Sequence, residues 1–119
     1  MDPLKRDVTD EAFVSLLAAY EVLRLLHREV PAQAVTVLLY VASHNNCHKQ
    51  AIEEDCDLTT ASCSRMITFL TGNSRPGVKN SEMNLIESFS DPTNGRRLML
   101  RLTPKGEALT KHIKSLIYG

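Results

Sequence analysis

Apolar residues dominate residues 12–26 and recur with the three-to-four-residue spacing of a helix. Thr9 or Asp10 is a suitable N-cap, and we expect this helix to end at about His27. Six of its residues are expected to face the domain's own core: Phe13, Leu16, Leu17, Tyr20, Leu23 and Leu26. Other apolar residues cover much of the remaining surface, which is typical of a helix buried on more than one side. In so short a chain, this pattern indicates contact with a second subunit.

Three helical segments follow, at residues 32–43, at residues 49–55 and after Thr59, which is a suitable N-cap. Residues 44–47 have the composition of a turn. The second and third segments predict a helix-turn-helix. Its expected core consists of Ile52, Cys56, Leu58, Cys63, Ile67 and Leu70. The outward positions of its second helix carry hydroxyl groups and one arginine. An ordinary exposed helix would carry Glu–Lys pairs there, so this composition favours insertion into a DNA groove.

Two strands are predicted at residues 85–90 and 98–102. Residues 91–97 lie between them and contain turn residues followed by two adjacent arginines. A hairpin with a basic tip, directly after a helix-turn-helix, is a wing. Arginine is well suited to enter a minor groove or to bind phosphates. Residues 72–80, which precede the hairpin, have the composition of a flexible loop.

The last predicted helix follows Thr103, an N-cap with Pro104 at the first helical position. The length of 119 residues suits one domain. We therefore predict a mainly α fold with a small β-hairpin wing (α+β) in a single winged-helix domain over residues 1–119. In this winged helix-turn-helix, dimerisation helices at about residues 10–28 and 103–118 flank a DNA-binding core at about residues 31–102.

Charge is distributed unevenly, although 14 basic and 14 acidic residues give a net charge of zero. Residues 1–58 contain five basic and ten acidic residues, whereas residues 59–105 contain seven basic and three acidic ones. Zero net charge argues against a histone-like protein that coats nucleic acid without selectivity. A basic segment beside an acidic body suits docking on a polyanion through one surface. Taken alone, ordinary scatter of solvated charge explains the pattern equally well.

Three segments of the chain resemble the MarR family of winged-helix transcription regulators, at residues 58–67, 90–97 and 102–106. The resemblance implies a homodimer that binds a pseudo-palindromic operator. It also implies that the recognition helix enters the major groove and that Arg96 of the wing enters the minor groove. The family usually has Asp two residues before that arginine, where this chain has Asn94. Residues 72–80 look like an insertion relative to the family.

The predicted DNA-binding residues lie on the recognition helix, in the loop and on the wing. They are Thr59, Thr60, Ser62, Ser64, Arg65, Arg75, Lys79, Asn94, Arg96 and Arg97. The predicted dimer interface lies on the first and last helices. Its residues are Val14, Leu17, Ala18, Leu25, Leu109, Ile113, Leu116 and Ile117.

His44, Cys47 and His48 are the only candidates for a metal site, and their spacing does not match a structural zinc pattern. Cys56 and Cys63 fall at core positions, where cysteine acts as a small hydrophobic residue. The glycines form no phosphate-binding loop, and no nucleophile elbow is present. We therefore expect neither a metal nor a cofactor, and no enzymatic activity.

Double-stranded DNA is the leading expected partner, and two alternatives stay open. A winged helix can serve as a protein-interaction module, either an adaptor or an inhibitor, and the acidic half of the chain favours such a role. The other alternative is binding of single-stranded DNA. The sequence argues against it, because the basic segment has only two aromatic residues, Phe69 and Phe89, on which bases could stack. Three cysteines make no disulfide framework, so we expect a reducing, cytoplasmic compartment. We expect no membrane span, because the most apolar stretch, residues 12–26, is too short, and no signal peptide, because acidic residues crowd that stretch.

Overall fold

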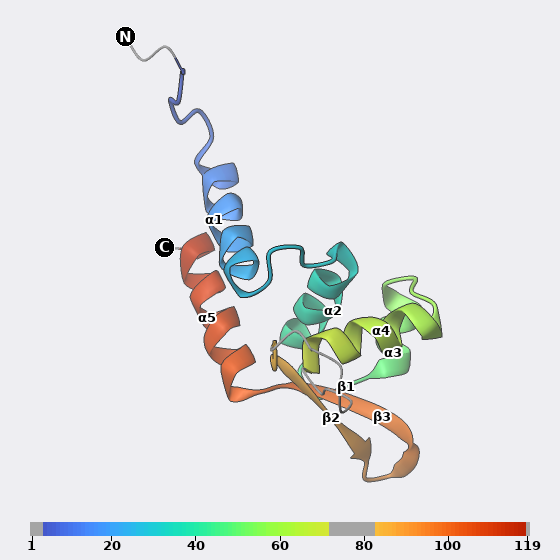
Figure 1. Ribbon diagram of the computed structural model, residues 1–119. Coiled ribbons are helices and arrows are strands. Elements are labelled where there is room, and N and C mark those ends of the chain that lie inside the picture. The colour runs from blue at the N-terminus through green and yellow to red at the C-terminus, as the bar shows by residue number, and fades with distance from the viewer. Residues whose placement is uncertain (1–3, 72–82, 119) are drawn as a thin grey trace.

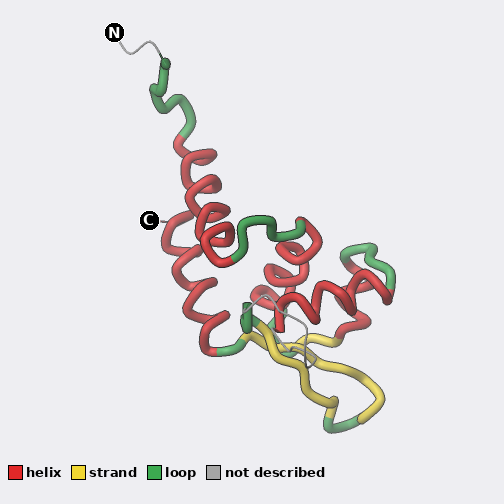
Figure 2. The backbone as a smooth tube through the Cα atoms, in the orientation of Figure 1, coloured by secondary structure: helices red, strands yellow, loops and turns green. Residues whose placement is uncertain are grey.

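The computed structural model describes residues 4–71 and 83–118 (Figure 1). Within them lie five helices: α1 (Glu11–Leu26), α2 (Ala32–Ser43), α3 (Lys49–Asp55), α4 (Thr60–Thr71) and α5 (Pro104–Tyr118). Strands β1 (Cys47–His48), β2 (Ile86–Asp91) and β3 (Asn94–Leu102) form one sheet. Figure 2 shows the β2–β3 hairpin extending from one end of the helical body. The predicted α+β winged-helix class is confirmed.

Side-chain caps begin the helices where the sequence places them. Asp10 accepts hydrogen bonds from the backbone N–H groups of Ala12 and Phe13 at the start of α1. The hydroxyl oxygens of Thr59 and Thr103 accept hydrogen bonds, each 3.0 Å long, from backbone N–H groups three residues further along α4 and α5. Each cap satisfies a helix N–H group that otherwise has no partner within the helix.

The sheet is antiparallel, has the strand order β1-β3-β2, and differs in two ways from the predicted hairpin. Residues 44–47 were expected to form a turn, but Cys47 and His48 pair with Leu100 and Met99 of β3. A strand of two residues has too few positions to show an alternating pattern. The second hairpin strand begins at Asn94 and not at Leu98, so the turn between the strands is shorter than predicted.

The core lies between α2, the helix-turn-helix, the sheet and α5, with Ala19 and Leu23 of α1 at its margin. Ile52, Cys63 and Leu70 are fully buried, as expected, while Cys56 and Leu58 pack against the core from partly buried positions. Leu85 joins three elements, because its N–H donates to the carbonyl of Leu70 and its carbonyl accepts from the N–H of Thr103. A methyl group at Gly106 would lie 2.0 Å from the Leu85 carbonyl oxygen, so the close approach of α5 requires glycine.

Helix α1 packs against the chain over a narrower face than its sequence indicates. It runs beside α5 in the opposite direction, and its N-terminal half projects away from the body (Figure 1). Of the six residues expected to face the core, only Leu23 is buried. Phe13, Leu16, Leu17, Tyr20 and Leu26 are exposed, with Phe13 at 69% and Leu17 at 61%. That expectation was wrong for these five residues, because the described part of the chain offers α1 no second layer to pack against.

Residues 72–80, which were predicted to form a flexible loop, lie outside the described residues, as do the candidate DNA contacts Arg75 and Lys79. In the part of the chain that the structure describes, no helix combines the length and apolar character needed to cross a membrane.

Candidate nucleic-acid interface

Helix α4 presents small polar side chains on its outer face. Thr59, Ser64 and Arg65 are exposed, and Ser62 is half-buried. The guanidinium of Arg65 donates a 3.1 Å hydrogen bond to the hydroxyl of Ser62, one turn earlier on the same face. These side chains are short enough for a helix to approach the floor of a groove, and Arg65 is long enough to reach a base edge there.

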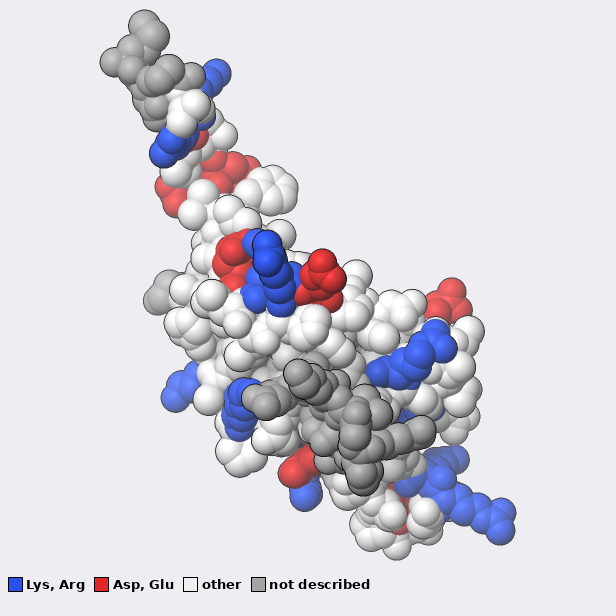
Figure 3. All heavy atoms as spheres, viewed as in Figure 1, with Lys and Arg blue, Asp and Glu red and all other residues white. Residues whose placement is uncertain are grey.

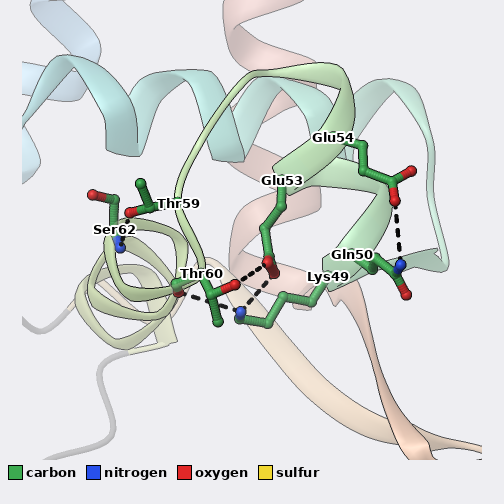
Figure 4. Close-up of polar contacts among 7 residues, drawn as sticks. All are labelled: Lys49, Gln50, Glu53, Glu54, Thr59, Thr60 and Ser62. Carbon is green, nitrogen blue, oxygen red and sulfur yellow. Dashed lines mark hydrogen bonds and ion pairs between the residues drawn. The ribbon is translucent and has the colours of Figure 1, made fainter.

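A polar network joins the first turn of α4 to α3, and Figure 4 shows its members facing one another. The Thr60 hydroxyl donates a 2.7 Å hydrogen bond to Oε1 of Glu53. The ammonium of Lys49 lies 2.7 Å from Oε2 of the same carboxylate and 3.4 Å from the Thr60 carbonyl oxygen. Lys49 and then Thr60 lower the pKa of Glu53 through these bonds, which stabilise the ionised form.

Sequence reasoning missed Lys49 and Glu53, although their spacing of four residues on one helix is a recognisable signal for an ion pair. It also treated Thr60 as a DNA contact. In the structure, the Thr60 hydroxyl is already engaged with a carboxylate.

A groove separates α3 and the start of α4 from the wing. It has a volume of about 390 Å³. Its lining residues are His48, Lys49, Gln50, Glu53, Thr60, Arg96, Arg97 and Leu98. Figure 3 shows basic side chains projecting from the end of the molecule that the wing forms. Of the predicted DNA-binding residues, the groove therefore brings together Thr60, Arg96 and Arg97. The lining does not include Thr59, Ser62, Ser64, Arg65 or Asn94.

The wing arginines are exposed on β3. Within residues 4–71 and 83–118, neither the Arg96 nor the Arg97 guanidinium makes a hydrogen bond or an ion pair. Asn94 lies two residues before Arg96. Its side-chain oxygen accepts a 3.2 Å hydrogen bond from the backbone N–H of Arg96. Asn94 therefore shapes the backbone of the wing and leaves the guanidinium unrestrained by this bond.

The candidate metal residues have other roles. His48 lies 2.8 Å from Asp91, whereas His44 stacks on Tyr40 and hydrogen-bonds to Ser43. Cys47 is buried, and burial raises the pKa of its thiol. In the described ranges, no group of three or more His, Cys, Asp or Glu residues is arranged to hold a metal ion.

The expected dimer surface is largely open. Val14, Leu17, Leu25 and Ile117 are exposed, and three further members are half-buried, namely Ala18, Leu109 and Leu116. Ile113 is different, because it is buried in the core of the chain itself. It also lines a surface pocket together with Ile117, so its place in the interface stays a prediction.

No protein-family model and no curated protein matches this sequence, but solved structures do. One is the PcaV transcriptional regulator from Streptomyces coelicolor in complex with its natural ligand. Its TM-score is 0.59 and its identity is 18%, over 95% of this chain and 79% of that chain. Another is overoxidized AbfR bound to DNA, with a TM-score of 0.60 and 18% identity over 89% of this chain and 71% of that one. A third is MarR, with a TM-score of 0.59 and 19% identity over 94% of this chain and 72% of that one.

This chain has the MarR-type winged-helix fold. In this MarR-type arrangement, α3 and α4 form the helix-turn-helix and β2 and β3 form the wing, as the sequence predicted. Identities of 18–19% show the fold alone.

Proposed function

We propose that this protein is a sequence-specific regulator of transcription that binds double-stranded DNA as a homodimer. Helix α4 enters the major groove and presents Arg65 to the base edges. Arg96 and Arg97 bind the adjacent minor groove or the backbone. The observation that carries the proposal is the groove in which the first turn of α4, at Thr60, adjoins two exposed guanidinium groups of the wing, while Arg65 is exposed further along the same helix.

The proposed homodimer is supported by the apolar surface of α1. Phe13, Leu16, Leu17 and Leu25 are all more than half exposed, although such side chains are usually buried. A second copy that packs on α1 and α5 would remove this surface from water. Two-fold symmetry would then place two α4 helices on two half-sites of one duplex, which accounts for a pseudo-palindromic operator.

A cytoplasmic location is part of the proposal. Cys47, Cys56 and Cys63 are free thiols, which suits a reducing compartment. The proposal includes no enzymatic step.

The decisive experiment selects a duplex from a random pool with the purified protein. Fluorescence anisotropy then measures its affinity and that of a scrambled duplex at several salt concentrations. We expect the selected duplex to bind more tightly and both affinities to fall steeply with salt. Arg96→Ala should weaken binding to both duplexes and lower the salt dependence.

Arg101→Ala is the matched control for Arg96→Ala. Arg101 lies on the same strand, but it is paired at 2.7 Å with Glu87 and lies over the ring of Phe89. We expect its removal to leave the salt dependence unchanged. If the parent protein binds neither duplex at low salt, the DNA-binding proposal is wrong and a protein-interaction module takes its place.

A further inference from the structure

The groove between α4 and the wing contains three cations and one anion. Lys49, Arg96 and Arg97 supply the positive charge, and Glu53 supplies the negative charge. The three cations are not equivalent. Within the described residues, the wing guanidiniums have no partner, whereas the Lys49 ammonium is held 2.7 Å from the Glu53 carboxylate.

The Lys49–Glu53 pair is well shielded from water. The two side chains are 15% and 16% exposed, so solvent and salt screen their attraction less than they would at an open surface. Both carboxylate oxygens of Glu53 are engaged, one by Lys49 and the other by the Thr60 hydroxyl. Lys49 is thus the groove cation whose charge is already neutralised inside the protein.

Whether a cation is already neutralised inside the protein affects how steeply the affinity for DNA falls with salt. Each cation that pairs with a phosphate releases a counterion from the DNA and steepens the dependence of log affinity on log salt by about 0.9. A lysine that remains paired with a carboxylate releases none. Phosphate contacts also carry no sequence information, so such a lysine would add equally to the affinity for every duplex.

We propose that Glu53 is a positioning residue that acts as an internal counterion, holding Lys49 away from DNA phosphate and thereby limiting affinity for DNA of any sequence. This inference rests on the proposed DNA-binding function. Glu53 has a second effect through the same carboxylate, because its bond to Thr60 fixes the first turn of the recognition helix relative to α3. One side chain therefore sets both the placement of α4 and the number of cations that the groove offers to phosphate.

Glu53→Gln tests the proposal, because the amide oxygen can still accept the Thr60 hydrogen bond while the negative charge is lost. We expect tighter binding to the selected and the scrambled duplex by the same factor. We also expect the salt slope to steepen by about 0.9, which amounts to an additional loss of about threefold between 50 mM and 200 mM salt. A purely structural role for Glu53 would instead lower affinity and leave the slope unchanged, and that result overturns the proposal.

Glu54→Gln is the matched control. Glu54 is the next residue of α3, and its carboxylate accepts a 3.2 Å hydrogen bond from the side-chain amide of Gln50 instead of pairing with a lysine. Removing the charge of Glu54 frees no cation, so we expect the salt slope of Glu54→Gln to equal that of the parent. A slope that steepens as much in Glu54→Gln as in Glu53→Gln would show a general charge effect and overturn the proposal.

The double variant Lys49→Met/Glu53→Gln gives an independent test that does not depend on a freed lysine. It replaces a shielded ion pair with neutral groups of similar size, a change that proteins often tolerate. We expect the salt slope of the parent, because Lys49 makes no phosphate contact in the parent. A slope shallower by about 0.9 would mean that Lys49 already binds phosphate, which contradicts the proposal.

These outcomes separate the inference from the function on which it rests. If the parent binds DNA and Arg96→Ala weakens that binding, an unchanged slope in Glu53→Gln overturns only the role of Glu53. If the parent binds no duplex, both proposals are wrong.

Discussion

The imidazole of His48 and the carboxylate of Asp91 lie 2.8 Å apart across 43 residues of sequence. His48 ends β1 and directly precedes α3, whereas Asp91 ends β2 at the turn of the wing. The Asp91 side chain is 8% exposed, and it also accepts hydrogen bonds from the backbone N–H and the hydroxyl of Thr93. The pair therefore ties the wing turn to the start of the helix-turn-helix.

The Asp91 contacts predict an acid-sensitive wing. His48 first, and then the two hydrogen bonds from Thr93, hold the pKa of Asp91 well below its ordinary value of 3.8. Because the folded pKa is depressed, the stability that Asp91 contributes is present above pH 3.8 and is lost as the pH falls through the folded value. We expect Asp91→Asn to unfold at lower urea concentration than the parent at neutral pH.

Urea unfolding of both proteins, from about pH 5 down to about pH 2, measures this dependence. The difference in midpoint between parent and Asp91→Asn should narrow as the pH falls. A difference that stays constant over this range would show that Asp91 remains unpaired in solution.

Assembly is tested at Leu17, which is 61% exposed on α1. We expect light scattering to give about twice the chain mass of 13.3 kDa for the parent. Leu17→Glu should shift the protein to the monomer, because burying an unpaired carboxylate in an apolar contact is unfavourable. Leu98→Glu, which changes a leucine that is also exposed but lies on the wing, should leave the dimer intact. A parent that remains monomeric at micromolar concentration would refute the two-fold model of operator binding.

Local sequence signals predicted the helices of this fold because their causes are local. Helical periodicity and the caps at Asp10, Thr59 and Thr103 depend on residues within one or two turns, and all three caps are observed. Strand β1 was missed because its pairing partners on β3 lie about 50 residues away in sequence. The faces of α1 were assigned wrongly because periodicity shows that a surface is apolar and does not show which chain covers it.

Some features of the candidate site could likewise be predicted from the sequence, and others could not. The exposure of Arg65, Arg96 and Arg97 follows from the positions of charged residues in their elements, and the sequence predicted it. The contact between Glu53 and Thr60 depends on the turn that brings α3 against α4, so composition alone could not indicate it. Likewise, the pairing of His48 with Asp91 exists only once the sheet has formed.

The junction of α5 with Leu85 predicts a steric effect at Gly106. A Cβ atom there would lie 2.0 Å from the Leu85 carbonyl oxygen, and backbone must move to admit it. We expect Gly106→Ala to lower the free energy of unfolding by about 1–3 kcal/mol, the usual cost of overpacking. Gly95→Ala is the control, because a methyl group at that wing position meets nothing within 4 Å and should change stability by less than about 0.5 kcal/mol. Equal stability of the two variants in urea would contradict the close approach of α5.

Arg65 and Arg96 should respond differently to the same conservative change. Arg65 lies on the exposed face of α4, where a planar guanidinium can bind two acceptors of one guanine. Lysine keeps the charge and loses that bidentate geometry. We therefore expect Arg65→Lys to cost about 1–3 kcal/mol on the selected duplex and little on the scrambled one, with the salt slope retained.

Arg96 lies on the wing, where the expected contact is with phosphate or a narrow groove and depends mainly on charge. Arg96→Lys should therefore retain most of the affinity for both duplexes, while Arg96→Ala loses affinity for both and lowers the slope by about 0.9. Anisotropy titrations of the three variants on both duplexes, at two salt concentrations, make the comparison. If Arg65→Lys weakens both duplexes equally, Arg65 contacts the backbone, and the reading of bases must then be assigned to other residues of α4.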